Sequence, residues 1–272
     1  MQFRQKALSK LQSPEELDVP VRFARPQGRL VLAVTVVVMA AATFWALTGT
    51  VSAKLGAPGV LTHAEGAYVL QSPVAGQVTA VLAEEGRFLP PGAPLLNVRT
   101  EQGDRPVRAV TGGRLTTLLA TVGSVVATGA DVATVEHVKN ADDPLMAVLY
   151  VPGGSGAAIA VGAAVDLDVQ SAPRNRFGAL RGRVKSVGRA PQTAAQISGF
   201  LGDRALAEQF AGQFAGQGNP VAVLVQLERS ATTRSGYAWS SADGPPYALD
   251  STTPVTGTVH LAAQRPADWL LP

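Results

Sequence analysis

The segment Gln71–Val98 reads QSPVAGQVTAVLAEEGRFLPPGAPLLNV, and Arg108–Val135 repeats its pattern as RAVTGGRLTTLLATVGSVVATGADVATV. The two segments align without a gap at an offset of 37 residues, as Gly76 does with Gly113. Identical residues fall at Gly76/Gly113, Thr79/Thr116, Leu82/Leu119, Ala83/Ala120, Gly86/Gly123, Gly92/Gly129, Ala93/Ala130 and Val98/Val135. The matched glycines mark turns that need φ > 0 or a close backbone approach. Since a solenoid needs roughly three or more copies, two copies predict one small domain with pseudo-two-fold symmetry.

Each copy resembles one half of a biotinyl/lipoyl-type β-sandwich, with a strand P-x-x-G-x-V, a turn E-G-x-x-V and then x-x-G-x-x-L. The resemblance implies a β-sandwich of two repeats. In carrier proteins of this type, a modified lysine sits on the hairpin that joins the halves. The joining segment here, Arg99–Val107, contains no lysine. The lysines of the chain are Lys6, Lys10, Lys54, Lys139 and Lys185. Because an amide-linked arm needs an amine at the tip, we expect a scaffold without a lipoyl or biotinyl cofactor.

The N-terminus predicts a membrane anchor. Leu30–Leu47 (LVLAVTVVVMAAATFWAL) carries no charge, and about 20 apolar residues cross a bilayer as a helix, so we expect a transmembrane helix over residues 30–50. The preceding leader, residues 1–29, holds six basic and three acidic side chains. The positive-inside rule then places the N-terminus in the cytoplasm and the C-terminal domain outside. A signal peptide cleaved after Ala53 is the alternative.

The leader itself predicts short helices. Phe3, Ala7, Leu8 and Leu11 share one helical face, and Ser13–Glu16 has the form of a capping box. Such a basic helix can rest on anionic lipid or dock on a membrane or cytoplasmic partner, and the sequence leaves both interpretations open.

Composition narrows the functional classes. Aromatic residues make up only 6% of the chain, whereas Gly (28) and Pro (19) are plentiful, which favours short strands and many turns. Residues 30–272 hold 17 basic and 17 acidic side chains, a balance that argues against nucleic-acid binding. Without cysteine, the chain has no disulfide, thiolate metal site or catalytic thiol.

The second half predicts a small, partly closed β-barrel. Its expected strands, separated by glycine-rich turns, are Leu145–Val151, Val165–Val169, Leu180–Val187, Val221–Glu228 and Val255–Leu261. Between the third and fourth of these, Leu201, Leu206, Phe210 and Phe214 predict a short helical excursion over about residues 194–216. The expected fold is therefore mainly β, with a single N-terminal transmembrane helix, the two-repeat sandwich and the barrel.

The whole chain resembles HlyD-type membrane-fusion (periplasmic adaptor) proteins. The order of leader (1–29), span (30–50), lipoyl-like domain with a lead-in strand (51–138) and barrel (139–272) is the family's order. Ile159–Leu167 followed by Gly182–Val187 resembles its barrel motif I-x-x-G-x-x-V-x-L … G-x-V-x-S-V. Gly257–Val259 and Arg265–Pro272 resemble its last strand and tail. Phe3–Leu8 together with Ser13–Asp18 resembles a narrower branch of the family, which serves the secretion of ribosomally made, leader-cleaved peptides of the bacteriocin type.

The resemblance implies a non-enzymatic adaptor in the inner membrane. It would work with an ABC exporter, possibly one with a peptidase domain, and form a homo-oligomer around the exit path of an exported peptide. The leader and span would contact the transporter, and the barrel and lipoyl-like face would self-associate. Long adaptors carry a coiled-coil hairpin between the lipoyl halves. The nine residues Arg99–Val107 are too few for one, so we expect no contact with an outer-membrane channel through that tip.

We predict no catalytic, cofactor-binding or metal-binding residues. His63, His137 and His260 lack a ligand partner at i+3 or i+4 spacing, which disfavours a zinc site. Gly153–Ala157 misses the nucleophile elbow because Ala157 stands where glycine is needed, so Ser155 is expected in a turn. The alternative functions are a stand-alone membrane-anchored envelope β-protein and a hydrolase that uses Ser155.

Overall fold

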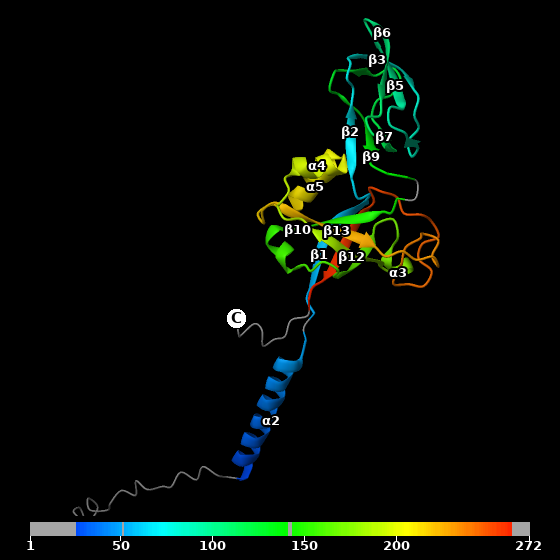
Figure 1. The fold of residues 1–272 in the computed structure, drawn as a ribbon. Coiled ribbons are helices and arrows are strands. Elements are labelled where there is room, and N and C mark those ends of the chain that lie inside the picture. Colours follow the sequence, from blue (N-terminus) through cyan, green and yellow to red (C-terminus); the bar gives the residue numbers. More distant parts are fainter. Residues whose placement is uncertain (1–25, 51, 141–142, 263–272) are drawn as a thin grey trace, which may run out of the picture. The chain divides into compact units, whose positions relative to one another are not determined.

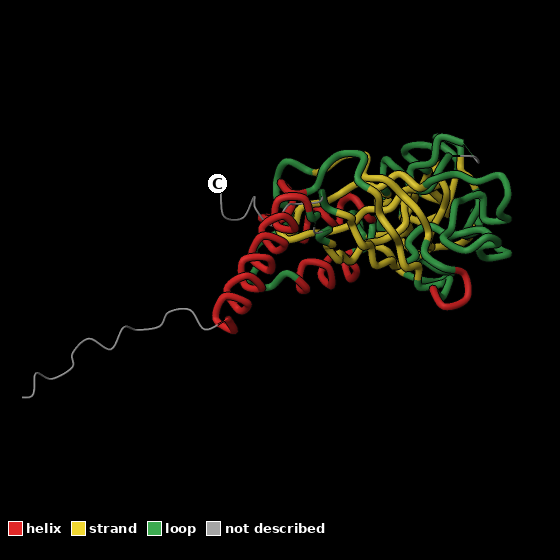
Figure 2. Tube along the Cα trace, turned by 90° about the horizontal axis from the view of Figure 1, so that it is seen from below, coloured by secondary structure: helices red, strands yellow, loops and turns green. Residues whose placement is uncertain are grey.

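A computed structural model of the chain describes residues 26–50, 52–140 and 143–262. The predicted leader helices and the family-like tail Arg265–Pro272 lie outside the described residues. The chain forms two units, one containing the N-terminal helix and the other extending from Ser52 to Ala263. Figure 2 shows that the second unit consists mainly of strands and loops, with less helix. The predicted mainly β fold class, with one N-terminal apolar helix, is confirmed.

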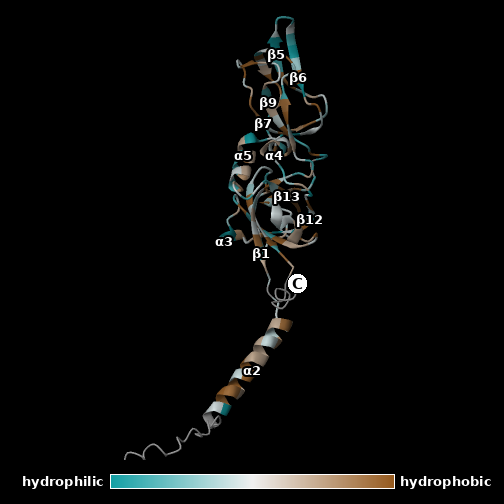
Figure 3. Ribbon diagram, turned by 90° about the vertical axis from the view of Figure 1, so that its left-hand side faces the viewer, coloured by the Kyte–Doolittle hydropathy of each residue, from teal (hydrophilic) through white to brown (hydrophobic). Residues whose placement is uncertain are grey.

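The first unit contains helix α2 (Pro26–Thr48). Its segment Gly28–Thr48 contains an 18-residue window with a mean hydropathy of 2.4 and is long and apolar enough to cross a membrane. Figure 3 shows hydrophobic residues along its length. The helix begins at Pro26, four residues before the expected residue 30, and proline suits a first helical position because its ring fixes φ near the helical value and no N–H bond is needed there. The hydroxyls of Thr35 and Thr43 donate to the carbonyls of Val31 and Met39, which satisfies polar groups within the helix itself.

The repeated segment forms two four-stranded sheets that pack as a sandwich (Figure 1). The first sheet has the order β2-β9-β7-β4 and the second β6-β5-β3-β8. The strands of the first copy are β2 (Ala67–Gln71), β3 (Gly76–Val81), β4 (Phe88–Leu89) and β5 (Pro94–Thr100). Those of the second copy are β6 (Gly103–Arg108), β7 (Gly113–Leu118), β8 (Val125–Val126) and β9 (Asp131–Glu136). Exchanging the copies exchanges the sheets, which is the predicted pseudo-two-fold symmetry.

The symmetry extends to backbone irregularities. The pairing of β3 with β5 shifts register between Val78 and Ala80, and that of β7 with β9 shifts between the equivalent Leu115 and Thr117. A Cβ on Gly76 would overlap the Arg99 carbonyl oxygen, just as a Cβ on Gly113 would overlap that of Glu136. Both glycines therefore permit the same close strand approach, as the repeat predicts.

The same symmetry governs the turns. The Gly86 N–H donates to the Leu115 carbonyl at 2.7 Å, and the Gly123 N–H donates to the Val78 carbonyl at 2.8 Å. Both glycines have positive φ, 82° and 91°. Each turn thus ties one sheet to the other in the same way in both copies. The sandwich core includes Leu70, Val78, Leu95, Leu96, Val98, Leu115, Val132 and Val135.

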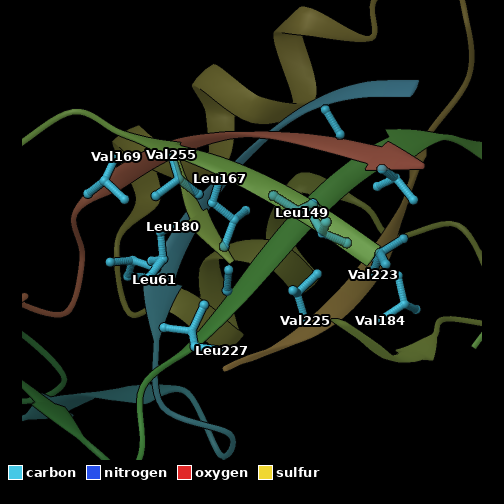
Figure 4. Packing of buried hydrophobic residues seen from close by; sticks show 14 of the residues in the cluster. Leu61, Leu149, Leu167, Val169, Leu180, Val184, Val223, Val225, Leu227 and Val255 are labelled. Carbon is cyan, nitrogen blue, oxygen red and sulfur yellow. The ribbon is translucent and has the colours of Figure 1, made fainter. Parts of the chain in front are cut away.

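The barrel closes with six strands in the order β1-β10-β13-β12-β11-β14. Its strands are β1 (Lys54–Thr62), β10 (Met146–Pro152), β11 (Ala164–Val169), β12 (Leu180–Val187), β13 (Pro220–Leu227) and β14 (Pro254–His260). The five strands expected after the repeat are all present. Figure 4 shows side chains from these strands, among them Leu149, Leu167 and Val225, pointing into a shared interior.

The first barrel strand corrects the expected domain boundary. The sequence interpretation gave residues 51–138 to the sandwich and treated the segment after Ala53 as its lead-in strand. In the structure β1 pairs with β10 and, over residues Lys54–Val60, with β14. This sixth strand also explains why the barrel is closed rather than partly closed. The sandwich is an insertion between the first two barrel strands, β1 and β10.

Helices occupy the connections of the barrel. The helical excursion is two helices, α4 (Ala194–Leu201) and α5 (Arg204–Gln213), because Gly202 is left-handed and Asp203 caps a new helix. Phe210 and Phe214 belong to the apolar cluster that covers Val60, Val148 and Tyr150 on the outside of the barrel. Two short elements were not predicted, the 3₁₀ helix η1 (Gly153–Ala158) and α3 (Arg174–Phe177).

Candidate functional site

The joining segment between the two halves is a tight hairpin. Strands β5 and β6 pair up to Thr100 and Gly103, which leaves only Glu101 and Gln102 at the turn. Gly103 has φ 105°, a conformation that favours glycine. The Arg99 Nε lies 3.1 Å from the Asp104 carboxylate just below the turn. The tip of the hairpin therefore carries one acidic and one amide side chain and no lysine.

The sandwich exposes apolar side chains at symmetric positions. Leu82 and Leu119 are equivalent in the two copies, and both are more than half exposed. Phe88 on β4 and Val125 on β8 form a second equivalent pair, and Val125 is 80% exposed. Since β4 and β8 are edge strands, these side chains border unpaired backbone. Sequence reasoning assigned self-association to this domain but missed these residues, although the repeat places an apolar residue at each position twice.

A buried polar cluster lies where the sandwich joins the barrel. Glu136 ends β9 and is 1% exposed, and His63 follows β1 and is 3% exposed. The Glu136 Oε1 lies 2.8 Å from the His63 Nδ1, and it accepts hydrogen bonds from the His63 N–H at 3.1 Å and the Thr62 hydroxyl at 3.2 Å. Burial raises the pKa of Glu136, but hydrogen bonds from His63 and Ser251 together with the charge of His63 outweigh that effect, so the pKa lies below its ordinary value.

The helical hairpin α4–α5 contacts both the barrel and the sandwich. The Thr134 hydroxyl on β9 donates to the Gly202 carbonyl at 3.2 Å. A Cβ on Gly66, in the connection to β2, would overlap the Phe200 carbonyl oxygen. An exposed pair, Lys139 Nζ and Glu65 Oε1 at 2.8 Å, also joins the two connections that leave the sandwich. The junction is thus held by contacts from three separate segments.

Each of the three histidines contacts a different partner. His63 contacts Glu136, His260 Nε2 lies 2.9 Å from Asp166, and the His137 ring packs on Tyr68 with ring centroids 4.9 Å apart. Among the described residues, no three His, Asp or Glu side chains are placed to hold a metal ion. Ser155 lies in η1, and no hydrogen bond of the described residues joins it to a histidine. The described part of the chain therefore shows no serine–histidine–acid arrangement around Ser155 that would support the hydrolase hypothesis.

The fold of this chain is similar to that of several solved structures. ZneB from Cupriavidus metallidurans matches 78% of this chain and 100% of its own, with a TM-score of 0.51 and 11% identity. MacA from Actinobacillus actinomycetemcomitans matches 80% of this chain and 81% of its own, with a TM-score of 0.50 and 8% identity. The chain shares its fold with ZneB and MacA. A weaker match, with a TM-score of 0.42 and 10% identity, covers 76% of this chain and 99% of the membrane fusion protein Spr0693 from Streptococcus pneumoniae R6. No family model matches the chain.

Proposed function

We propose that this chain is a non-enzymatic adaptor (membrane-fusion) subunit of an ABC-type export system. The observation that carries the proposal is the fold shared with ZneB and MacA over 78% and 80% of the chain. The order of apolar helix, sandwich and barrel, by which the sequence resembles HlyD-type adaptors, supports it further. In this proposal α2 is a single-pass anchor in the inner membrane, with the N-terminus in the cytoplasm and the β domains outside.

The cargo in this proposal is a ribosomally made peptide of the bacteriocin type. The resemblance of the opening residues to the branch that serves such peptides supports this choice. A transporter with a peptidase domain is then the fitting partner, since leader-cleaved peptides need a protease. The adaptor itself supplies no chemistry. Its role is to frame the exit path as a homo-oligomer.

Self-association is the role that we assign to the exposed apolar pairs of the sandwich. Leu82, Leu119, Phe88 and Val125 are exposed in the single chain, and burying such side chains stabilises an interface by about 25 cal/mol per Å². The repeat presents the same pattern on two edges, β4 and β8. One copy can therefore offer one edge to each of two neighbours, as a closed ring requires.

The tight hairpin at Glu101 and Gln102 supports a short adaptor. A helical hairpin that reaches an outer-membrane channel would leave the sandwich at this turn, and here the strands pair up to the turn itself. We therefore propose that the complex works in a single-membrane envelope or without channel contact through this tip.

Affinity purification tests the partner. Tagged full-length protein is crosslinked in its native membrane, solubilised in mild detergent and analysed by mass spectrometry. We expect an ABC transporter among the recovered proteins. In the control, residues 26–48 are replaced by an unrelated apolar span of equal length, and transporter recovery should fall because the native span contacts the partner. Recovery of the protein alone would instead favour a stand-alone envelope role.

Export measurements test the cargo. We expect deletion of the adaptor gene and deletion of the transporter gene to cause the same loss of an extracellular peptide, measured by mass spectrometry of the culture medium. Unchanged export without the adaptor would contradict the peptide assignment. Labelling of Ser155 by a serine-reactive probe would favour the hydrolase alternative instead.

A further inference from the structure

A small cavity opens on the outer wall of the barrel beside helix α4. Its volume is about 210 Å³. Strands β10, β13 and β12 form its floor through residues such as Val148, Leu224 and Val187, and Phe200 of α4 forms one side. The chain connections contribute Ala64 and Gln192. All of these residues belong to the described unit that contains the barrel.

Tyr150 is the unusual member of the cavity wall. It is fully buried on the outer face of β10, with its ring 5.0 Å from the Phe210 ring between centroids. Its hydroxyl has no hydrogen-bond partner among the described residues. A buried hydroxyl without a partner costs stability, and native proteins rarely retain one without a reason. The neighbours on the helical side, such as Ile197 of α4 and Phe210 of α5, are apolar and offer it no acceptor.

The chemistry of the wall defines what could fill the cavity. None of the residues that line it carries a formal charge, so an ion would lose its hydration without compensation. Burial raises the pKa of Tyr150 well above its ordinary value, so the hydroxyl stays protonated and can donate. A cavity of roughly 150 Å³ holds benzene, and this one is somewhat larger. The fitting ligand is a small apolar body with one neutral acceptor oxygen.

We propose that this cavity is a binding site for a small uncharged molecule, whose carbonyl or ether oxygen accepts a hydrogen bond from the Tyr150 hydroxyl. The apolar body would pack on Val148, Leu224 and Phe200. The site lies outside the barrel interior and is independent of the proposed export function. The ligand would bind on the outer wall of the barrel, against which α4 and α5 pack.

The tyrosine content of the chain allows a direct test. The protein has four tyrosines, Tyr68, Tyr150, Tyr237 and Tyr247, so 3-fluorotyrosine labelling of the full chain in lipid nanodiscs gives four fluorine signals. The Tyr150→Phe variant assigns the signal of interest. Acetophenone is the probe, and isopropylbenzene is the matched control, because it has the same number of non-hydrogen atoms but no acceptor. We expect acetophenone to move only the Tyr150 signal, saturably, and to bind roughly ten-fold more tightly than the control.

Two variants complete the test. Ala222→Phe fills the cavity from β13 and should abolish the saturable shift, while unchanged signals from the other tyrosines show that the variant is folded. In thermal melts, Tyr150→Phe should keep or raise the stability of the free protein and reduce the shift in Tm that acetophenone causes. The proposal is overturned if all four signals move together, if the two probes bind equally, or if Ala222→Phe binds acetophenone as the native chain does.

Discussion

The carboxylate Oε1 of Glu136 lies 2.8 Å from the Nδ1 of His63, and both side chains are shielded from solvent. Glu136 is the last residue of the sandwich and His63 follows the first strand of the barrel. The pair therefore joins the two β domains at the point where the chain crosses between them. A buried pair of this kind stabilises one arrangement, because neither group can lose its partner without leaving a polar atom unsatisfied.

Replacing Glu136 by Ala should therefore cost about 3–5 kcal/mol of unfolding free energy, since His63 and Thr62 lose their acceptor. Urea unfolding monitored by circular dichroism measures the change. Glu65→Ala is the control, because the Glu65–Lys139 pair is exposed and screened by water, and its midpoint should not move measurably. A loss below about 1 kcal/mol for Glu136→Ala would show that the pair is dispensable.

The same carboxylate predicts how stability depends on pH. The pKa of Glu136 is lower in the folded protein than its ordinary value of 4.5. Its contribution is therefore complete above pH 4.5 and is lost as the pH falls through the folded pKa. Between about pH 5 and pH 3 the native protein should lose stability as this carboxylate takes up a proton, and the Glu136→Gln variant should lose less. Parallel pH profiles for the two proteins would contradict the assignment.

The repeat makes a paired prediction about two glycines. Gly76→Ala and Gly113→Ala should both destabilise the sandwich by about 2–3 kcal/mol, because each Cβ meets the carbonyl oxygen of a neighbouring strand. Gly154→Ala is the control, since a Cβ there meets nothing within 4 Å, and we expect a change within about 0.5 kcal/mol. Thermal melts of the three variants measure these changes in stability. If only one of the two substitutions lowered the stability, the two copies would be equivalent in structure but would not contribute equally to stability.

Self-association should depend on the exposed apolar residues of the sandwich. Leu119→Asp should shift the oligomer toward monomer, measured by mass photometry in nanodiscs, because a charge would be buried at the interface. Thr121→Asp places the same charge on an exposed polar position nearby and should leave the oligomer intact. Equal effects of the two substitutions would assign self-association to another surface.

The turn at Glu101–Gln102 should accept an insertion. A helical hairpin inserted there should leave the Tm of the sandwich within a few degrees of the native value, because loop length changes closure entropy only slowly. The same insert between Val78 and Thr79, inside β3, should prevent folding of the domain. Differential scanning calorimetry separates the two results. Unfolding caused by the hairpin-tip insert would argue against this turn as an insertion point.

Local patterns in the sequence predicted most of the fold. The repeat predicted two equivalent copies because the positive φ of each turn favours glycine, as at Gly86 and Gly123. Strand β12 follows the expected range Leu180–Val187, since its apolar and charged residues alternate. Strand β1 was misassigned because its partner β14 lies at the far end of the chain, and no local pattern records such pairing.

The candidate site was harder to predict for the same reason. Glu136 and His63 read as an ordinary acid and an isolated histidine, and only the fold brings them together. The ordered connection between β13 and β14 was not predicted either, although Trp239 packs into the barrel core from it and donates to the Ser235 hydroxyl at 2.9 Å. Polar, glycine-containing segments read as loops whether or not they pack. The Tyr150 cavity depends on helix packing that no periodicity reveals.

The insertion of the sandwich within the barrel sets an order of events during synthesis. All strand pairings of the sandwich lie between Ala67 and Glu136, so it can be complete while the rest of the chain is still emerging. Strand β1 has made no permanent partner by then, because its pairings within the described residues are with β10 and β14. The barrel closes after His260 arrives, which makes closure the slow, non-local step. Until that moment the open strand edges are vulnerable to aggregation, and a chain truncated before β14 retains that vulnerability permanently.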